Sequence, residues 1–175
     1  MVADEGGLQT SFRHAMRRMP AAVTVVTSAD ATRRHGMTAT AVASLSLDPP
    51  SLVVCINRAT LLHDIMHAGE HFCVNILRED HVEISAAFSG AAPPEARFSI
   101  GNWQTAPEGV HYLEDAQTSI ICRKMSSVLH ATHAIFVGEA VAVHFRETVT
   151  PLIYQNGSYC VGVALDQTVR DRACA

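Results

Sequence analysis

The sequence predicts a mainly β protein in which six or seven short antiparallel strands form a closed or nearly closed barrel with short flanking helices. Apolar strand-like runs recur along the 175-residue chain, and turn residues separate them. Long helical patterns do not alternate with these runs, as they would in a doubly wound parallel sheet. Hydrophobic residues make up 48% and charged residues 17% of the sequence, which is typical of a domain with a buried core. We therefore expect a single domain over residues 1–175, with an ordered core at about 8–165.

The first elements are a helix and a hairpin. Residues 8–19 carry apolar side chains at helical spacing, which predicts an amphipathic helix that Pro20 ends. Residues 23–28 and 37–44 read as two strands. The polar segment 29–35 between them predicts the turn of a hairpin.

Two further strands enclose a short helix. The segment Asp48-Pro49-Pro50 breaks the pattern, and the apolar run 51–57 after it predicts a buried strand. Residues 61–68 predict a helix that Gly69 closes. The next apolar run, 71–77, predicts a fourth strand.

The second half of the chain continues in the same style. Asp80 and Glu83 have capping-box spacing and predict a helix that ends near Phe88. Residues 91–109 read as a loop with Trp103 as its only large anchor. The remaining elements are all strands, predicted at 118–126, at 134–145 and after Pro151.

Charge and the N-terminal sequence exclude several classes of function. A net charge of −4 offers no basic surface for nucleic acid. The first nine residues contain two acidic side chains and no apolar segment, so no signal peptide is predicted. No apolar run is long enough to span a bilayer. We expect a cytoplasmic protein with no membrane or nucleic-acid partner.

Cysteines and familiar motifs add little. The five cysteines form no C-x-x-C pair and lie mostly in apolar runs, which predicts buried structural thiols; Cys174, near the C-terminus, is expected to be exposed. The chain has no G-x-G-x-x-G, no G-x-x-x-x-G-K and no G-x-S-x-G. His63, His67 and His71 are spaced by four residues, but the glutamate of H-E-x-x-H is missing. We favour chance pairing over a metal site.

The most informative segment is 36–58, GMTATAVASLSLDPPSLVVCINR, where small and hydroxylated residues replace the large side chains of an ordinary core strand. Small side chains let a flat ligand approach the backbone, and hydroxyl and amide groups can bond its polar edge. The strand that ends at Asn57 is followed by Arg58 and Thr60, which suit a phosphate. A flat, phosphorylated ligand fits the description of a flavin nucleotide.

Taken together, six parts of the chain resemble the short-chain flavin reductase family, whose fold is the FMN-binding split barrel, an antiparallel Greek-key barrel. They are residues 12–28, 36–58, 72–77, 97–103, 132–140 and 151–159. The likeness is greatest to reductase components of two-component flavin-dependent monooxygenases, such as that of 4-hydroxyphenylacetate 3-monooxygenase.

The resemblance implies an NAD(P)H:flavin oxidoreductase in which hydride passes from the nicotinamide to flavin N5. This step needs positioning rather than an acid or base, so no catalytic residue is predicted. The flavin is FMN or FAD, and the hydride donor is NADH or NADPH. The resemblance further implies a homodimer with the flavin close to the subunit interface, and a partner monooxygenase that receives the reduced flavin.

The resemblance also implies which residues bind. The predicted flavin-binding residues are Thr38, Thr40, Ala41, Ser44, Ser46, Asn57, Arg58, Thr60 and Asn75. Asn75 lies in an apolar strand, so its amide needs either the flavin or a hydrogen bond inside the barrel. The predicted nicotinamide-binding residues are His133, Phe98 and Tyr154, with Tyr159 as a further aromatic that could stack on either ligand.

One position departs from the family pattern. Ala131 stands where the family usually has glycine, directly before Thr132 and His133. The added methyl is expected to tighten the backbone where the nicotinamide binds. Two other readings stay open: a non-catalytic flavin- or haem-binding module on the same barrel, and a metal-dependent hydrolase that uses the histidines of 63–71.

Overall fold

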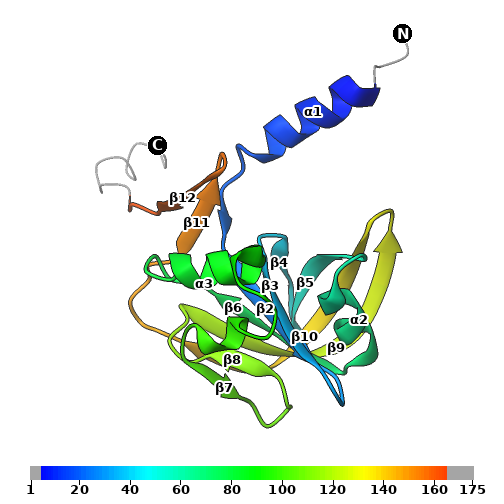
Figure 1. Cartoon of the computed structure of the whole chain (residues 1–175), viewed down its shortest axis with the longest axis vertical. Coiled ribbons are helices and arrows are strands. Elements are labelled where there is room, and N and C mark those ends of the chain that lie inside the picture. Colours follow the sequence, from blue (N-terminus) through cyan, green and yellow to red (C-terminus); the bar gives the residue numbers. More distant parts are fainter. Residues whose placement is uncertain (1–4, 165–175) are drawn as a thin grey trace.

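The computed structural model describes residues 5–164, which form a curled antiparallel sheet with short helices against it (Figure 1). The sheet has seven strands in the order β3-β2-β6-β9-β10-β5-β4. In chain order they are β2 (Thr24–Ala29), β3 (Arg34–Ala39), β4 (Val42–Leu47), β5 (Pro50–Asn57), β6 (His71–Ile76), β9 (Thr118–His130) and β10 (His133–Phe145).

The sheet is rolled into a barrel because its two edge strands follow each other in the sequence. An open seven-stranded sheet would hold β3 and β4 about 29 Å apart. Only Thr40 and Ala41 separate them, which allows a span of about 10 Å. The predicted barrel is confirmed. The prediction of one strand over 37–44 is wrong, because the chain turns a corner at Thr40 and Ala41 between two strands.

The interior of the barrel is filled by side chains from strands near both ends of the strand order. Val26, Val54, Val74 and Phe136 are fully buried in one cluster, although β2 and β5 lie far apart in the sheet. A Cβ atom at Gly138 of β10 would lie 2.4 Å from the Phe72 ring. The residue must be glycine because the ring occupies this space.

Helix α2 (Leu61–Ala68) lies where the sequence predicts it, beside β2 and β3. The Thr60 side chain accepts from the amide of His63 and caps its N-terminus. At the other end Lys124 donates to the carbonyls of Met66 and His67, at 2.9 and 2.6 Å. A cation there suits the negative end of the helix. Both ends of α2 are therefore fixed to the barrel.

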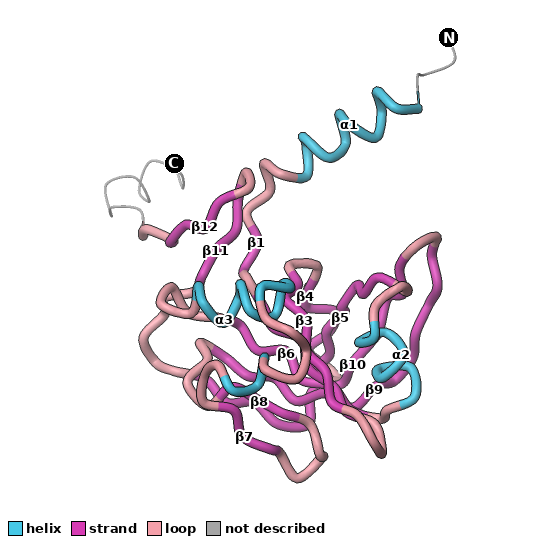
Figure 2. The backbone as a smooth tube through the Cα atoms, in the orientation of Figure 1, coloured by secondary structure: helices cyan, strands magenta, loops and turns pink. Residues whose placement is uncertain are grey.

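Helix α1 (Glu5–Met16) and a small second sheet project from the barrel (Figures 1 and 2). The sheet contains β1 (Ala21–Ala22), β11 (Leu152–Gln155) and β12 (Ser158–Val161). The amphipathic helix is predicted within a few residues, but its apolar stripe does not pack on the barrel. Leu8 is 64% and Phe12 65% exposed.

The region after β6 differs from the prediction in two ways. Helix α3 (Val82–Ala86) has His81 as its N-cap without a side-chain bond, so the predicted capping box at Asp80 does not form; the Asp80 carboxylate pairs with Arg78 instead. The helix continues into η1 (Ala87–Ala91). The predicted loop holds a turn, η2 (Arg97–Ser99), and a strand, β7 (Trp103–Thr105), which forms a hairpin with β8 (His111–Leu113) just beyond the loop. Such short strands carry no alternating pattern of their own.

The cysteines of the described region are all free thiols. Cys73 and Cys122 are buried, and burial raises the pKa of the Cys122 thiol to about 12, whereas Cys55 and Cys160 are half-buried. Cys174 lies outside the described residues. Within residues 5–164, no helix combines the length and the hydropathy needed to cross a bilayer.

Candidate functional site

The corner between β3 and β4 lies beside the end of β5. The carbonyl of Ala41 accepts the Cys55 amide at 3.0 Å, and the ladder between β4 and β5 pairs Val42 with Val54. The two segments that the sequence singled out, 38–46 and 57–60, are therefore neighbours. Hollows open on either side of this junction. Most of the predicted flavin-binding residues line one or another of these hollows.

The first is a polar hollow of about 560 Å³ at the end of β5. Its lining includes Asn57, Arg58, His63 and Thr132. Residues 57–60 form a tight turn into α2: the Asn57 side-chain oxygen accepts the Ala59 amide at 2.9 Å. The Thr60 hydroxyl donates to the Asn57 carbonyl at 2.8 Å. A guanidinium beside the start of a helix is a suitable arrangement for an anion.

The turn between β9 and β10 forms the opposite wall of the polar hollow. The Arg58 amide donates to the Thr132 carbonyl at 2.9 Å, and Arg58 Nη1 donates to the Ala131 carbonyl at 3.2 Å. Ala131 has a φ of 48°, in the left-handed region that favours glycine. The departure from the family pattern therefore falls on a strained backbone position whose carbonyl holds Arg58.

The second hollow is an apolar groove of about 600 Å³ on the other side of the corner. Strands from across the barrel supply its lining, which includes Thr24, Thr40, Val42, Ser44, Ser46 and Leu52. Ser44 is exposed, whereas the Ser46 hydroxyl donates to the Asp48 carbonyl at 3.0 Å. Small side chains leave space for a flat ligand, and both this groove and the polar hollow have volumes typical of ligand sites.

A third hollow of about 280 Å³ shares Thr40 with the groove. The Thr38 hydroxyl donates to the Ser85 carbonyl at 2.8 Å, and the Ser85 hydroxyl lies 2.9 Å from that of Tyr159. Tyr154 packs edge-on against Tyr159, with ring centroids 5.5 Å apart. Two tyrosine rings and the hydroxyls of Thr38 and Ser85 therefore lie next to the groove.

Asn75 lies in the core and does not line any of these hollows. It is fully buried, and its amide donates to the Val25 carbonyl at 3.0 Å. Its oxygen accepts from the Leu113 amide and the Ser119 hydroxyl, both at 2.8 Å. Of the two roles considered for Asn75, these contacts favour the hydrogen bond inside the barrel, and we leave it out of the proposed site.

The three predicted nicotinamide residues lie in different places. His133 is exposed at the start of β10, paired with Asn57 across the ladder, with Nδ1 2.9 Å from the Thr132 hydroxyl. Phe98 belongs to an aromatic cluster with Phe88 and Trp103, with centroid separations of 5.2 and 5.3 Å. Tyr154 alone lines the hollow beside the groove. One chain does not bring the three side chains together.

The histidines of 63–71 do not converge. The rings of His63 and His67 stack on α2 with centroids 6.0 Å apart, while His71 begins β6. In the part of the chain that the structure describes, no three His, Cys, Asp or Glu side chains are arranged to hold a metal.

Sequence reasoning missed the contributions of Ser85 and Thr132. Ser85 is a fully buried serine on α3, and Thr132 lies in a two-residue turn. Neither residue lies in a sequence pattern that indicates ligand binding, because each reaches its hollow only when segments distant in the sequence come together. Tyr159 was considered only as a possible stacking aromatic, and its hydrogen bond to Ser85 is a tertiary feature.

The chain is similar over most of its length to known proteins. A family model described as Flavin reductase like domain matches residues 16–162. The reductase component of the FADH(2)-dependent resorcinol hydroxylase of Rhizobium sp. (strain MTP-10005) is 45% identical over 156 residues, covering 88% of this chain and 87% of that protein. The FMN reductase (NADH) RutF of Stutzerimonas stutzeri (strain A1501) is 36% identical over 152 residues, covering 87% of each. The crystal structure of a flavin reductase domain protein from Arthrobacter sp. FB24 superposes with a TM-score of 0.83 at 29% identity, covering 90% of this chain and 98% of that one.

Proposed function

The chain belongs to the flavin reductase-like domain family, and on this premise we propose that it is an NAD(P)H-dependent flavin reductase that supplies reduced FMN or FAD to a monooxygenase. The observation that carries the proposal for this chain is the placement of the polar hollow and the apolar groove on either side of one corner. A flavin nucleotide has the same two parts, a phosphate and a flat ring.

The polar hollow is the proposed site of the phosphate. Arg58 supplies the charge, and the capped N-terminus of α2 supplies main-chain dipoles. Because Arg58 is held by the carbonyl of Ala131, its side chain needs little reordering when it meets an anion. Asn57 and Thr60 shape the turn rather than offer free donors, since each already bonds within it.

The groove is the proposed site of the isoalloxazine ring. Ser44 and Thr40 present small polar side chains on an otherwise apolar lining. Ala41 is exposed at the corner beside the groove, and its carbonyl already accepts the Cys55 amide. A bound flavin would accept hydride from the nicotinamide. The chain itself would only bind, orient and exclude water, because hydride transfer needs positioning rather than an acid or a base. Tyr154 and Tyr159 are the proposed contacts for the nicotinamide.

We propose that the flavin is a substrate that leaves after reduction, and that a flavin-dependent monooxygenase receives it. Thr40, Ala41 and Ser44 are exposed, so the proposed ring site is open at the surface. The Rhizobium relative is named as the reductase component of a hydroxylase that depends on FADH(2). An open site and a relative of this kind favour release of the reduced flavin over its retention.

The proposed oligomer is a homodimer. Leu8, Phe12 and Met16 are exposed on α1, and Leu47 is 92% exposed at the rim of the groove. So much unpartnered apolar surface on one side is typical of an interface. A second copy would also bring further residues to the groove, and could unite the dispersed nicotinamide residues. Light scattering should give twice the mass of the chain, and Phe12→Asp should lower it to that of one chain.

The test of the enzyme is steady-state oxidation of NADH and of NADPH, each with FMN, FAD and no flavin. We expect a rate that depends on added flavin and saturates with it. No flavin-dependent rate in any pairing would reject the proposal. A spectrum of the purified protein that shows bound haem would favour the non-catalytic module instead.

A further inference from the structure

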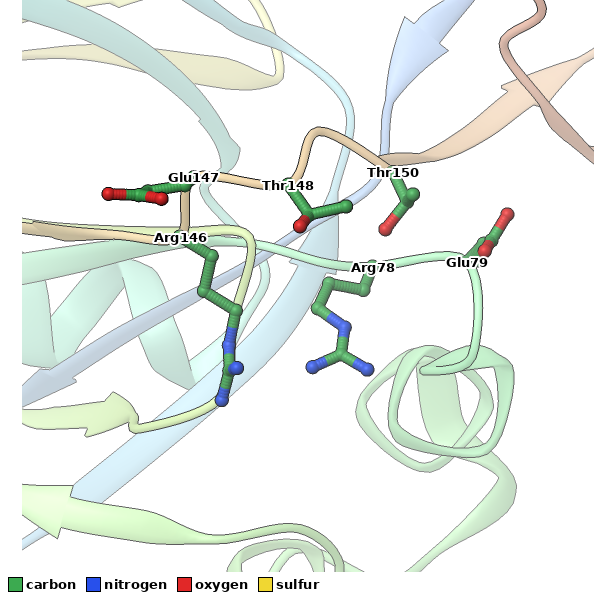
Figure 3. A pocket seen from close by; sticks show the side chains of 6 residues that line it. All are labelled: Arg78, Glu79, Arg146, Glu147, Thr148 and Thr150. Carbon is green, nitrogen blue, oxygen red and sulfur yellow. The ribbon is translucent and has the colours of Figure 1, made fainter.

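A hollow beside the residues that follow β6 is lined by charged side chains that the proposed reaction does not use (Figure 3). Its volume is about 470 Å³. The lining residues come from two segments, the end of β6 and the connection from β10 to β11. They are Arg78, Glu79, Arg146, Glu147, Thr148 and Thr150.

The two arginines extend in the same direction, whereas the two glutamates point away from them (Figure 3). Arg78 donates to the Asp80 carboxylate and to the Asp115 carbonyl, the latter at 3.4 Å. Arg146 has no side-chain hydrogen bond or ion pair to any residue within 5–164. One guanidinium is thus partly compensated, whereas the other has donors free for a ligand.

The backbone of this hollow is fixed by Gln117, which is buried. Its amide nitrogen donates to the Thr148 carbonyl at 3.0 Å, and its oxygen accepts the Thr150 amide at 2.7 Å. The Arg146 amide donates to the Gln117 carbonyl at 3.1 Å. The Glu79 amide donates to the Thr150 carbonyl at 2.9 Å. The backbone that carries the donors is therefore fixed before a ligand binds, and binding would cost little conformational entropy.

The number of donors favours a tetrahedral anion over a carboxylate. Each guanidinium carries five N–H groups, and the hydroxyls of Thr148 and Thr150 are directed toward the arginines (Figure 3). A carboxylate has two oxygens, which one guanidinium can satisfy. A phosphate has enough oxygens to accept from both guanidinium groups and from the two hydroxyls at the same time.

We propose that Arg78, Arg146, Thr148 and Thr150 form a phosphate-binding site separate from the proposed flavin site. The ligand is inorganic phosphate or the phosphate group of a small phosphomonoester. The site stands at the base of β11, since Thr150 precedes by four residues Tyr154, a proposed nicotinamide contact. An anion bound here would hold the 146–150 connection still.

The experiment is a titration of the ¹⁵N-labelled full chain with sodium phosphate, followed by backbone amide shifts at constant ionic strength. We expect saturable shifts at 78–79 and 146–150, at millimolar phosphate. Sodium acetate should act at least fivefold more weakly. Shifts at 57–60 report the proposed flavin site separately, so failure of either proposal is visible without the other. A parallel titration with AMP distinguishes a phosphomonoester from free phosphate as the better ligand.

Variants on the same connection make the assignment specific. Arg146→Ala should weaken phosphate binding at least tenfold, whereas Glu147→Gln, whose side chain points away, should bind as well or better. Both are surface changes, and an unaltered spectrum outside 144–152 shows that the fold is kept. The proposal is overturned by non-saturable shifts, by acetate acting as strongly as phosphate, or by full binding in Arg146→Ala.

Discussion

The polar hollow and the apolar groove flank one corner of the barrel but are built in opposite ways. At the polar end, the side chain of Arg58, the proposed phosphate contact, is held by the main-chain carbonyl of Ala131. At the apolar end, Thr40, Val42 and Ser44 offer space and few directed bonds. Groups held in advance provide affinity and selectivity for charge, whereas an open apolar surface accepts any flat ring and releases it. This division fits the proposal that the flavin is a substrate that leaves after reduction.

The largest effect that would test this division is expected from Arg58→Ala. The variant should weaken FMN binding about tenfold to a hundredfold, because a charge-assisted hydrogen bond contributes about 1.5–3 kcal/mol. Riboflavin lacks the phosphate and should lose little. Titration of both ligands by fluorescence quenching measures the two affinities, and equal losses would place Arg58 outside the phosphate site.

Ser44→Phe should weaken the binding of both ligands, whereas Arg58→Ala should weaken that of FMN alone. A phenyl group would fill part of the groove, and accommodating it should cost about 1–3 kcal/mol, which corresponds to about fivefold to 150-fold in affinity. FMN and riboflavin should suffer alike because both carry the ring. Leu45→Phe is the matched control, since Leu45 is exposed on the same strand but does not line the groove. Normal riboflavin binding by Ser44→Phe would move the ring to another site.

The variant His133→Ala tests whether this histidine contacts the nicotinamide or belongs to the polar hollow. If His133 meets the nicotinamide, as the sequence predicts, the variant should have a KM for NADH that is a few-fold higher and a slower reduction step, with flavin affinity nearly unchanged, because hydride transfer is sensitive to small displacements. Stopped-flow reduction and a flavin titration on one preparation separate the two effects. Since His133 pairs with Asn57 across the ladder, a loss of FMN affinity alone would assign it to the polar end.

Ala131→Gly tests the strain in the turn that holds Arg58. Ala131 is in the left-handed region, which costs an L-residue about 1–2 kcal/mol, and glycine removes that cost while adding freedom to the unfolded chain. We expect a gain of about 1 kcal/mol in the free energy of unfolding, seen as a Tm higher by about 2–4 °C. The hairpin at Asn156-Gly157 already has residues suited to positive φ, so Asn156→Gly should change Tm less.

The smallest effect is a dependence of stability on pH at the start of β3, the end of this strand that lies away from the corner. His111 Nε2 lies 2.6 Å from Arg34, and His35 Nε2 lies 3.3 Å from Arg97. Burial and then the neighbouring arginine lower the pKa of both histidines below the usual 6.5. The folded state therefore binds fewer protons than the unfolded state, and stability should be full above pH 6.5 and fall below it.

Melting curves between pH 5 and 8 check this expectation, with His111→Gln as the comparison. Glutamine can still accept from Arg34 but does not titrate, so the variant should show a smaller fall in Tm at low pH. A Tm that rises as the pH falls from 6.5 would contradict the sign. Neither histidine contacts Arg58, so the two histidines should affect FMN affinity less than they affect Tm.

Local pattern predicted most of the elements and the chemistry that we propose for the site. The small, hydroxylated run 36–46 and the Asn57-Arg58-Thr60 strand end predicted a ligand that is flat and phosphorylated. The helix at 61–68 was predicted with its bounds, because Thr60 and Gly69 punctuate it locally. The barrel could be predicted because short strands joined by turns have few other ways to bury their apolar faces.

Only the tertiary structure decided which of these residues meet. Asn75 was ambiguous in sequence because a buried amide needs partners, and its partners at Val25, Leu113 and Ser119 come from strands far apart in the chain. The corner at Thr40 exists because the sheet must close, not because residues 37–44 lack strand propensity. The strain at Ala131 depends on a φ that β9 and β10 impose through their register. Contacts between distant segments leave no periodic signal, because each partner is chosen by the closure of the barrel and not by its neighbours in sequence.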